Sequence, residues 1–399
     1  MVHPPADGPL AWIDALLSAE GQALLAELAE EPRTADTELR IITRYRTRYR
    51  ADLVSLALAQ VKLRERARAK FSRADRMYFT APGLEQASTE RMAVHHSRRF
   101  TGFAQIADLC SGIGGDLTGF ARDRRVIAVD TDPVHSRLGV LNADAYGAGS
   151  NVIAVCADVR EFDYSRVRAA FIDPARRSGE SRMRAGESEP PLDWCLALAA
   201  KGVALGIKAS PALGLDVVPE GWETEFVSEH RELKEAVLWA PVFATTKRRA
   251  TVLVPGGDEH TLIAAEGATL PVRAPGAYLL DPDPSVTRAG LVETLGAQLN
   301  GAWKIDDQIA FLSADIPLVT PFGRLLRVDA SMPWSLNRLR EALRALDVGS
   351  VDIRKRGSAV DVDEIQRRLK LRGARAATVV LTRAASAPWA MVCSERGLT

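Results

Sequence analysis

The sequence is poor in cysteine, in long apolar runs and in net charge, and each shortage excludes a class of protein. Its 399 residues contain four cysteines, none close enough to another for a C-x-x-C metal or redox pair. The six histidines show no zinc-ligand spacing, so we expect no metal. No stretch approaches the roughly 18 consecutive apolar residues of a transmembrane helix. We therefore expect a reduced, cytoplasmic protein without disulfides or membrane contact.

The charges cancel over the whole chain but not along it. Lys and Arg number 52 against 51 Asp and Glu, so bulk charge predicts no partner. Between Arg44 and Arg76, however, 11 basic residues accompany three acidic ones, and the stretch from Arg338 to Arg383 contains 12 and six. Charge runs are usually solvated helix faces, yet two such stretches also suit a phosphate backbone. The second interpretation is the one we favour.

The hydrophobic pattern changes twice along the chain and predicts three domains. Their predicted boundaries are 1–95, 96–256 and 257–399. In the first region apolar residues recur at the helical period, with one polar lapse at Gln60. The pattern indicates no strand here, and it predicts helices over 10–28, 39–71 and 83–99.

Short β-branched runs alternate with helical stretches in the middle region, which is typical of a mostly parallel sheet covered on both faces. The strands are predicted over 104–109, 125–130, 152–156, 169–173, 202–207 and 251–254. The helices are predicted over 117–122, 133–146, 159–168 and 192–200.

A turn-rich break at Pro255-Gly-Gly-Asp separates this region from the last one. The last region mixes both kinds of element and predicts a separate α+β domain. Its helices are expected over 339–346 and 362–371, and its strands over 377–381 and 389–392.

A glycine-rich turn, Asp108-Leu-Cys-Ser-Gly-Ile-Gly-Gly-Asp116, follows the first predicted strand directly. Such a turn lets a ligand approach the backbone closely. A dinucleotide fold would need a third small residue where Leu117 stands, which disfavours NAD or FAD. Three further strands end in Asp130, Asp158 and Asp173. Because the carboxyl ends of parallel strands meet at one edge, we expect these acids to converge with Asp108 on one cleft.

This set resembles the class I S-adenosylmethionine-dependent methyltransferases over about residues 95 to 255. The resemblance implies a Rossmann-like methyltransferase sheet and S-adenosylmethionine as cofactor. Asp108, with the glycine turn, would face the methionine part, Asp130 would accept both ribose hydroxyls, and Asp158 would contact the adenine. The implied cofactor-binding residues are Asp108, Cys110, Gly112, Gly114, Asp130, Asp158 and Val159.

A second motif, Asp173-Pro-Ala-Arg-Arg, is similar to the Asp/Asn-Pro-Pro-aromatic motif of methyltransferases that act on exocyclic amines of bases. It departs from that motif because Ala175 replaces the second proline and Arg176 the aromatic residue. An arginine plane can also stack on a base. The implied catalytic residues are Asp173, Pro174 and Arg176, and Arg177 and Lys208 are candidates for binding substrate.

The same motif also resembles the Asp-Pro-Pro-Arg-x-Gly run of the 5-methyluridine methyltransferases. Those enzymes use a cysteine at the end of the fifth strand, where this chain has Ala209 and Ser210. Cys195 lies in the preceding helix and is interpreted as a packing residue. A covalent mechanism on uridine is therefore disfavoured.

Segments across nearly the whole chain resemble the bacterial methyltransferases that carry a C-terminal THUMP-like domain. The segments are Tyr78-Phe-Thr-Ala-Pro-Gly, Asp173-Pro-Ala-Arg-Arg, Lys208-Ala-Ser-Pro and Ile353-Arg-Lys-Arg-Gly with Leu369-Lys-Leu-Arg-Gly. The implied fold is α/β, with an N-terminal helical domain, the methyltransferase sheet and an α+β THUMP-like domain. The implied substrate is RNA, tRNA or rRNA, which Arg354, Lys355 and Arg356 would help to bind.

Two alternatives stay open at this stage. The chain could methylate a small molecule or a protein, or it could be a non-catalytic RNA-binding module that keeps a cofactor pocket. His95 and His96, at the end of the third predicted helix, are interpreted as capping or packing residues.

Overall fold

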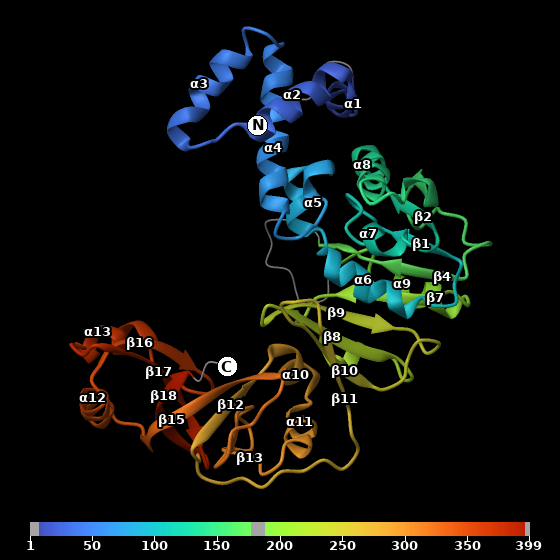
Figure 1. The fold of residues 1–399 in the computed structure, drawn as a ribbon. Coiled ribbons are helices and arrows are strands. Elements are labelled where there is room, and N and C mark those ends of the chain that lie inside the picture. The colour runs from blue at the N-terminus through green and yellow to red at the C-terminus, as the bar shows by residue number, and fades with distance from the viewer. Residues whose placement is uncertain (1–7, 177–187, 396–399) are drawn as a thin grey trace. The chain divides into compact units, whose positions relative to one another are not determined.

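The computed structural model of the chain describes residues 8–176 and 188–395 (Figure 1). It divides into two compact units, Met1–Ala209 and Ser210–Thr399. The sequence predicts three domains, 1–95, 96–256 and 257–399. This division differs from the two units and stays a prediction.

The first unit begins with helices, as predicted, and no strand occurs between residues 8 and 99. The helices are α1 (Ala11–Leu17), α2 (Ala19–Glu30), α3 (Ala35–Tyr45), α4 (Ala51–Ala67), α5 (Ala81–Gln86) and α6 (Glu90–Arg99). The apolar faces of α1 to α5 share one core, in which Ile13, Leu24 and Val54 are fully buried. Gln60, the polar lapse, is also buried, and its side-chain amide makes hydrogen bonds with both the N–H and the C=O of Phe79.

The single helix predicted over 39–71 is wrong, because the chain turns between α3 and α4. The turn places Arg44 and Arg48 against Glu31 and Glu27, which lie at the end of α2. These ion pairs join residues far apart in sequence, so the apolar period alone gave no sign of them.

The helices predicted over 10–28 and 83–99 are likewise each two helices. The first is α1 and α2, which are divided at Ser18, and the second is α5 and α6. Thr89 begins α6 by accepting a hydrogen bond from the N–H of Met92. The Nζ of Lys70 binds the backbone carbonyls of Leu84 and Ala87 at the end of α5, each at 2.8 Å. Ser88 lies between the two helices. The contacts of Lys70 with Ala87 and of Thr89 with Met92 fix the backbone on either side of it.

A parallel sheet follows, with the strand order β7-β4-β1-β2-β3 within the first unit. Its strands are β1 (Gln105–Leu109), β2 (Arg125–Asp130), β3 (Val152–Cys156), β4 (Ala169–Ile172) and β7 (Ala204–Ala209). A short pair, β5 (Ala175–Arg176) and β6 (Ser188–Glu189), follows β4. This order confirms the predicted methyltransferase sheet.

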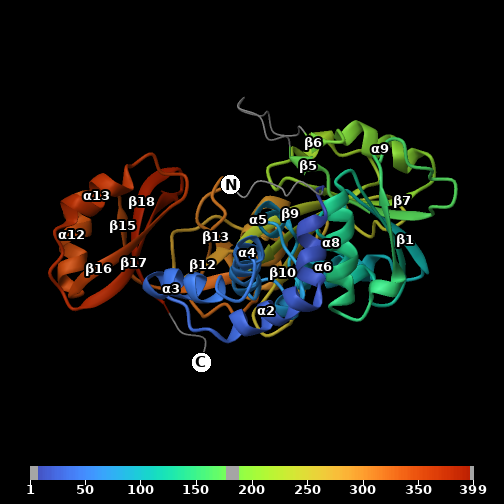
Figure 2. The same cartoon turned by 90° about the horizontal axis from the view of Figure 1, so that it is seen from above.

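Three helices accompany this sheet: α7 (Leu117–Phe120), α8 (Pro133–Asp144) and α9 (Leu192–Ala200). Helix α8 packs on β2 and β3, and α9 packs on β7 (Figure 2). The helix predicted over 159–168 is wrong, because this segment consists of turns. Asp158 and Asp163 each accept a hydrogen bond from the backbone N–H two residues further on, which favours a turn over a helix.

The second unit begins with the strands β8 (Glu223–Glu229), β9 (Glu232–Trp239), β10 (Arg248–Leu253) and β11 (Glu259–Ile263), ordered β11-β10-β8-β9. Sequence analysis missed β8 and β9 because they are rich in glutamate. Glu223 and Glu225 are nevertheless buried. Arg249 pairs with Glu223, and the indole N–H of Trp239 donates to Glu225 at 2.8 Å. Pro255-Gly-Gly-Asp forms the turn between β10 and β11.

The rest of the second unit is the predicted α+β region, a seven-stranded sheet ordered β13-β14-β12-β15-β18-β17-β16. The strands are β12 (Tyr278–Pro282), β13 (Trp303–Lys304), β14 (Leu312–Ala314), β15 (Gly323–Pro333), β16 (Val348–Lys355), β17 (Arg375–Ala384) and β18 (Ala387–Glu395). The helices are α10 (Pro284–Ala289), α11 (Val292–Gln298), α12 (Leu336–Ala345) and α13 (Val362–Leu369). In the described part of the chain, no helix is both long and apolar enough to cross a membrane.

Candidate active site

The glycine-rich turn begins where β1 ends and bends with left-handed backbone angles. Cys110, Gly112 and Gly114 have φ of 57°, 54° and 84°. A Cβ added at Gly112 would meet no atom of another residue within 4 Å, so this backbone faces open space. The Gly112 N–H donates to Oδ2 of Asp130 at 2.8 Å. The turn therefore presents bare backbone to a ligand and is tied to the end of β2.

Asp108 is a buried carboxyl group, and one of its oxygens lacks a hydrogen-bond donor among the described residues. Its side chain lies at the end of β1 and is 1% exposed. Oδ2 of Asp108 accepts no hydrogen bond from the residues that the structure describes. Burial, followed by the nearby charges of Asp116, Asp173 and Asp130, raises the pKa of Asp108 well above its ordinary value. A cationic donor brought to this atom would relieve that cost.

The pKa of Asp130 is shifted in the opposite direction to that of Asp108. Burial works to raise its pKa, but hydrogen bonds from His135, Asp132 and Gly112 outweigh burial and lower it. The His135 Nδ1 lies 3.4 Å from Oδ1 of Asp130, and that hydrogen bond raises the pKa of His135. Asp130 is thus an ionised acceptor beside the glycine turn.

Asp158 and Val159 follow β3, as predicted for an adenine contact. The side chain of Asp158 pairs with Arg160 at 2.6 Å, and the hydrogen bond from Arg160 lowers the pKa of Asp158. Val159 is buried, and its carbonyl accepts a hydrogen bond from the Tyr164 hydroxyl at 2.7 Å. Both residues are therefore held in place by neighbouring side chains.

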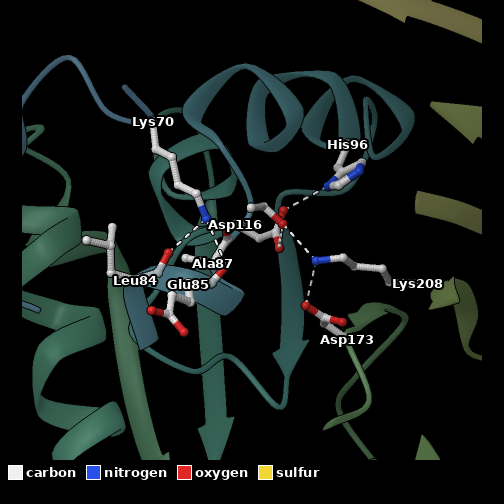
Figure 3. Close-up of polar contacts among 9 residues, drawn as sticks. Lys70, Leu84, Glu85, Ala87, His96, Asp116, Asp173 and Lys208 are labelled. Carbon is white, nitrogen blue, oxygen red and sulfur yellow. Dashed lines mark hydrogen bonds and ion pairs between the residues drawn. The ribbon is translucent and has the colours of Figure 1, made fainter. Parts of the chain in front are cut away.

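A chain of polar contacts connects the ends of β4 and β7 with the buried side of α6 (Figure 3). Lys208 Nζ lies 2.7 Å from Oδ2 of Asp173 and 3.1 Å from the Ser88 hydroxyl. Ser88 donates to Asp116 at 2.9 Å, and His96 Nδ1 lies 2.8 Å from the other oxygen of Asp116. The contacts join one lysine and one histidine to two aspartates through a single serine.

The buried end of this chain is fixed by close packing. A Cβ added at Gly119 of α7 would lie only 2.2 Å from the carbonyl oxygen of Ala93, so glycine allows α6 to approach α7. His96 is fully buried and stacks on Phe171 of β4, with ring centroids 4.8 Å apart. Burial opposes ionisation of Asp116, but the charge and hydrogen bond of His96 outweigh it, and the pKa of Asp116 is lowered.

The structure brings together Asp108, Asp130, Asp173 and Lys208, the cofactor and acceptor residues predicted at the sheet edge. Pro174 is buried beside them. Only the backbone of Arg176 can be described, in β5, and Arg177 lies outside the described residues. Cys195 is buried in α9, and burial raises the pKa of its thiol to about 12, as expected for a packing residue.

Sequence reasoning missed four members of this site: Lys70, Ser88, His96 and Asp116. His96 packs as expected, but it also binds Asp116. Asp116 was visible as the last residue of the glycine-rich motif, and Ser88 preceded the Thr-Glu pair that begins α6. No local pattern connects these residues, because the contacts span 14 to 120 positions of sequence.

The basic stretch between Arg44 and Arg76 is largely neutralised. Six of its 11 basic side chains pair with carboxylates: Arg44, Arg48, Arg50, Lys62, Arg66 and Arg68. Several of those acids lie outside the stretch, on α2 and α3. The local charge count therefore overstated the charge that this surface offers to a phosphate backbone.

Three family models match the chain. Residues 9–67 match a domain of unknown function, residues 103–188 match a model described as RNA cap guanine-N2 methyltransferase, and residues 323–395 match a THUMP domain-like model.

Among curated proteins, the chain is similar to an uncharacterized S-adenosylmethionine-dependent methyltransferase of Mycobacterium tuberculosis, found in strains CDC 1551 and H37Rv. The identity is 36% over 317 residues, which cover 76% of this chain and 84% of the relative. Among solved structures, a proposed methyltransferase of Porphyromonas gingivalis W83 is 18% identical, with a TM-score of 0.74 over 94% of this chain and 98% of that one. That likeness shows a shared fold.

The opposite pKa shifts of two buried aspartates predict opposite effects on stability. The raised pKa of Asp108 means that ionisation at neutral pH destabilises the folded state, so Asp108→Asn should raise the free energy of unfolding at pH 7. That gain should vanish as pH falls to the ordinary carboxyl range, where Asp108 is protonated in both states. The lowered pKa of Asp116 stabilises the fold above that range, so Asp116→Asn should cost about 1–3 kcal/mol at pH 7.

Urea denaturation of the two variants and the wild type, at pH 7 and near pH 4, measures both effects. The two substitutions remove the same charge and serve as controls for each other. A loss of stability in Asp108→Asn at pH 7 comparable to that in Asp116→Asn would contradict the electrostatic description of the site.

Proposed function

The chain belongs to the S-adenosylmethionine-dependent methyltransferases, and we propose that it transfers the methyl group to a base nitrogen of RNA, in tRNA or rRNA. The observation that carries the proposal is the pair of Asp173 and Lys208 at the end of the sheet. Asp173 begins the Asp-Pro-Ala-Arg motif and follows β4, which pairs with β1, the strand that leads into the glycine turn.

The residues at the turn fit the cofactor. Asp108 offers an unpartnered, buried carboxylate oxygen to the methionine ammonium, and Gly112 leaves open space above its backbone. In our proposal Cys110 and Gly114 complete this cradle, and Asp130 accepts the ribose hydroxyls. Asp158 and Val159 border the adenine. When bound, S-adenosylmethionine supplies an electrophilic methyl group on its sulfonium.

The chain's own contribution to the reaction is to place the acceptor. The Asp173 carboxylate accepts a hydrogen bond from the acceptor amine, and the carbonyl of Pro174 accepts another, so that the nitrogen lone pair points at the methyl carbon. A carboxylate has about four lone-pair positions, so Asp173 can bind the amine while it contacts Lys208. Lys208, held by Ser88, keeps the carboxylate in this position.

The chemical step is a direct displacement. The acceptor nitrogen forms a bond to the methyl carbon as the carbon–sulfur bond breaks, and the nitrogen then loses one proton. Asp173 is placed to receive that proton. With the cofactor bound, its sulfur would keep the bonding electron pair as a neutral thioether, so this chain's residues would have no leaving group to protonate. The proposed step needs no metal.

Two comparisons support RNA as the substrate. The model that matches the sheet is described by methylation of guanine N2, an exocyclic base amine of the kind that the Asp-Pro motif would orient. The THUMP domain-like match in the second unit adds a region whose name links it to RNA-binding domains. Arg176 and Arg177 follow the acceptor motif and are proposed to hold the base or its phosphate.

The cofactor assignment predicts the effect of Asp130→Ala. The variant loses charge-assisted hydrogen bonds to the ribose, each worth about 1.5–3 kcal/mol, so affinity should fall at least about tenfold. Calorimetric titration with S-adenosylhomocysteine measures it. Asp144→Asn, an exposed carboxylate at the end of α8, is the control and should bind like the wild type. Equal affinity in Asp130→Ala and wild type would overturn the assignment.

The acceptor assignment predicts that Asp173→Ala lowers the methylation rate by a factor of about 100 or more, because a positioning contact in the transition state is lost. Affinity for the cofactor should stay within a few-fold. Arg176→Ala should instead raise the RNA concentration needed for half-maximal rate, since its contact is present in ground and transition states alike.

Methyl transfer from labelled cofactor to tRNA and rRNA of a strain lacking the gene separates these effects. If Asp173→Ala keeps a rate near that of the wild type on such RNA, the acceptor is activated elsewhere, with Lys208 and Ser210 as the next candidates.

A further inference from the structure

Three arginines in the second unit surround one aspartate. Arg354 Nη1 lies 3.6 Å from Oδ2 of Asp281, and Arg356 Nη2 lies 3.2 Å from Oδ1. Arg231 Nη2 lies 4.0 Å from Oδ2 and 3.4 Å from the backbone carbonyl oxygen of the same residue. The cluster thus joins the hairpin between β8 and β9, the strand β12 and the end of β16.

Asp281 meets only part of the hydrogen-bonding capacity and charge of these arginines. Oδ1 of Asp281 accepts no hydrogen bond from the part of the chain that is described, and Nη1 of Arg356 is buried and donates none. Arg354 also reaches the exposed Asp352, with 3.0 Å between Nε and Oδ2. Counting both acids, three guanidinium groups face two carboxylates, so a positive charge remains in excess.

The backbone at Arg231 adopts a left-handed conformation that is costly for a residue with a side chain. His230 and Arg231, the two residues between β8 and β9, have φ of 52° and 61°. Tight hairpin turns with two positive φ angles favour asparagine and glycine, and other residues adopt them at a cost. Arg231 therefore occupies a turn position whose backbone conformation glycine would adopt at lower cost.

The remaining arginines are also preorganised. The guanidinium of Arg356 lies over the ring of Phe311, with its carbon 4.8 Å from the ring centroid. Side-chain exposures are 39% for Arg231, 26% for Arg354 and 30% for Arg356, against 14% for Asp281. The donors are held in place yet accessible, whereas the acid lies beneath them. Arg324, opposite Asp281 on β15, pairs with Glu395.

We propose that Arg231, Arg354 and Arg356 bind a phosphate of the RNA backbone, and that Asp281 holds the empty site together until the phosphate displaces it. A phosphate oxygen pair matches the fork of a guanidinium, whereas the Asp281 carboxylate leaves its Oδ1 without a hydrogen bond from the described residues. This site deepens the proposed function, on which it rests, because it gives the RNA a defined contact in the second unit.

The chain supplies a control of equal charge beside the same hairpin. Lys234 lies on β9, three residues after Arg231, and its Nζ pairs with the exposed Glu232. Lys234→Gln removes the same charge as Arg356→Gln without touching the cluster. Arg231→Gly removes the third arginine and at the same time relieves the turn, so its thermal midpoint should not fall.

The experiment measures binding of bulk tRNA to the full-length variants by fluorescence anisotropy as a function of salt. Arg231→Gly and Arg356→Gln should each raise Kd about five- to tenfold near physiological salt and reduce the slope of log K against log salt by about one. Lys234→Gln should change Kd less than twofold. Asp281→Asn removes the competing carboxylate and should lower Kd about threefold or more.

Either of two results would overturn the site: a Kd for Arg231→Gly and Arg356→Gln no higher than that of Lys234→Gln, or a Kd for Asp281→Asn equal to or above that of the wild type. Repeating the titration with inorganic phosphate as competitor distinguishes a site for free phosphate, at which phosphate displaces tRNA at millimolar concentration, from one that needs the polymer. The rate of methyl transfer to RNA is measured separately. If the enzyme methylates RNA and these substitutions leave Kd unchanged, the arginine site is wrong but the proposed function stands.

Discussion

Repulsion among carboxylates at one edge of a parallel sheet is the constraint on which the active site depends. The glycine turn and the strand ends bring Asp108, Asp116, Asp130 and Asp173 together, and each raises the energy of ionising its neighbours. The fold relieves this repulsion unequally. His96 and Lys208 contact Asp116 and Asp173, and backbone N–H groups donate to Asp130. Asp108 is buried, and its Oδ2 accepts no hydrogen bond from the described residues. In our proposal, the ammonium group of the cofactor's methionine part supplies the missing donor to Asp108.

The helices before the sheet are part of this site. Gln60 binds the backbone of Phe79, and Asn142 binds that of Tyr78 and also the carbonyl of Ile113 in the glycine turn. Lys70 fixes the end of α5 and thereby Ser88. The stretch that a local charge count would assign to RNA binding therefore acts mainly within the protein, since six of its 11 cations pair with acids of the helical region.

The features that could be predicted from the sequence are those set by local pattern and by sheet topology. Apolar strands that end in aspartate, and a glycine turn after the first of them, place Asp108, Asp130 and Asp173 together in any parallel sheet. Features that depend on distant partners could not be predicted. The buried glutamates of β8 read as solvent-exposed residues, and the break between α3 and α4 depends on ion pairs to α2. The contact of His96 with Asp116 requires the close approach of α6 and α7 at Gly119.

The most direct test of the account is nucleoside mass spectrometry of tRNA and rRNA from a strain that lacks the gene, from its parent, and from the deletion strain carrying either the wild-type gene or the Asp173→Ala variant. The account predicts that one methylated base disappears in the deletion strain, returns with the wild-type gene and does not return with the variant. An unchanged set of methylated nucleosides in the deletion strain, or full restoration by Asp173→Ala, would contradict it.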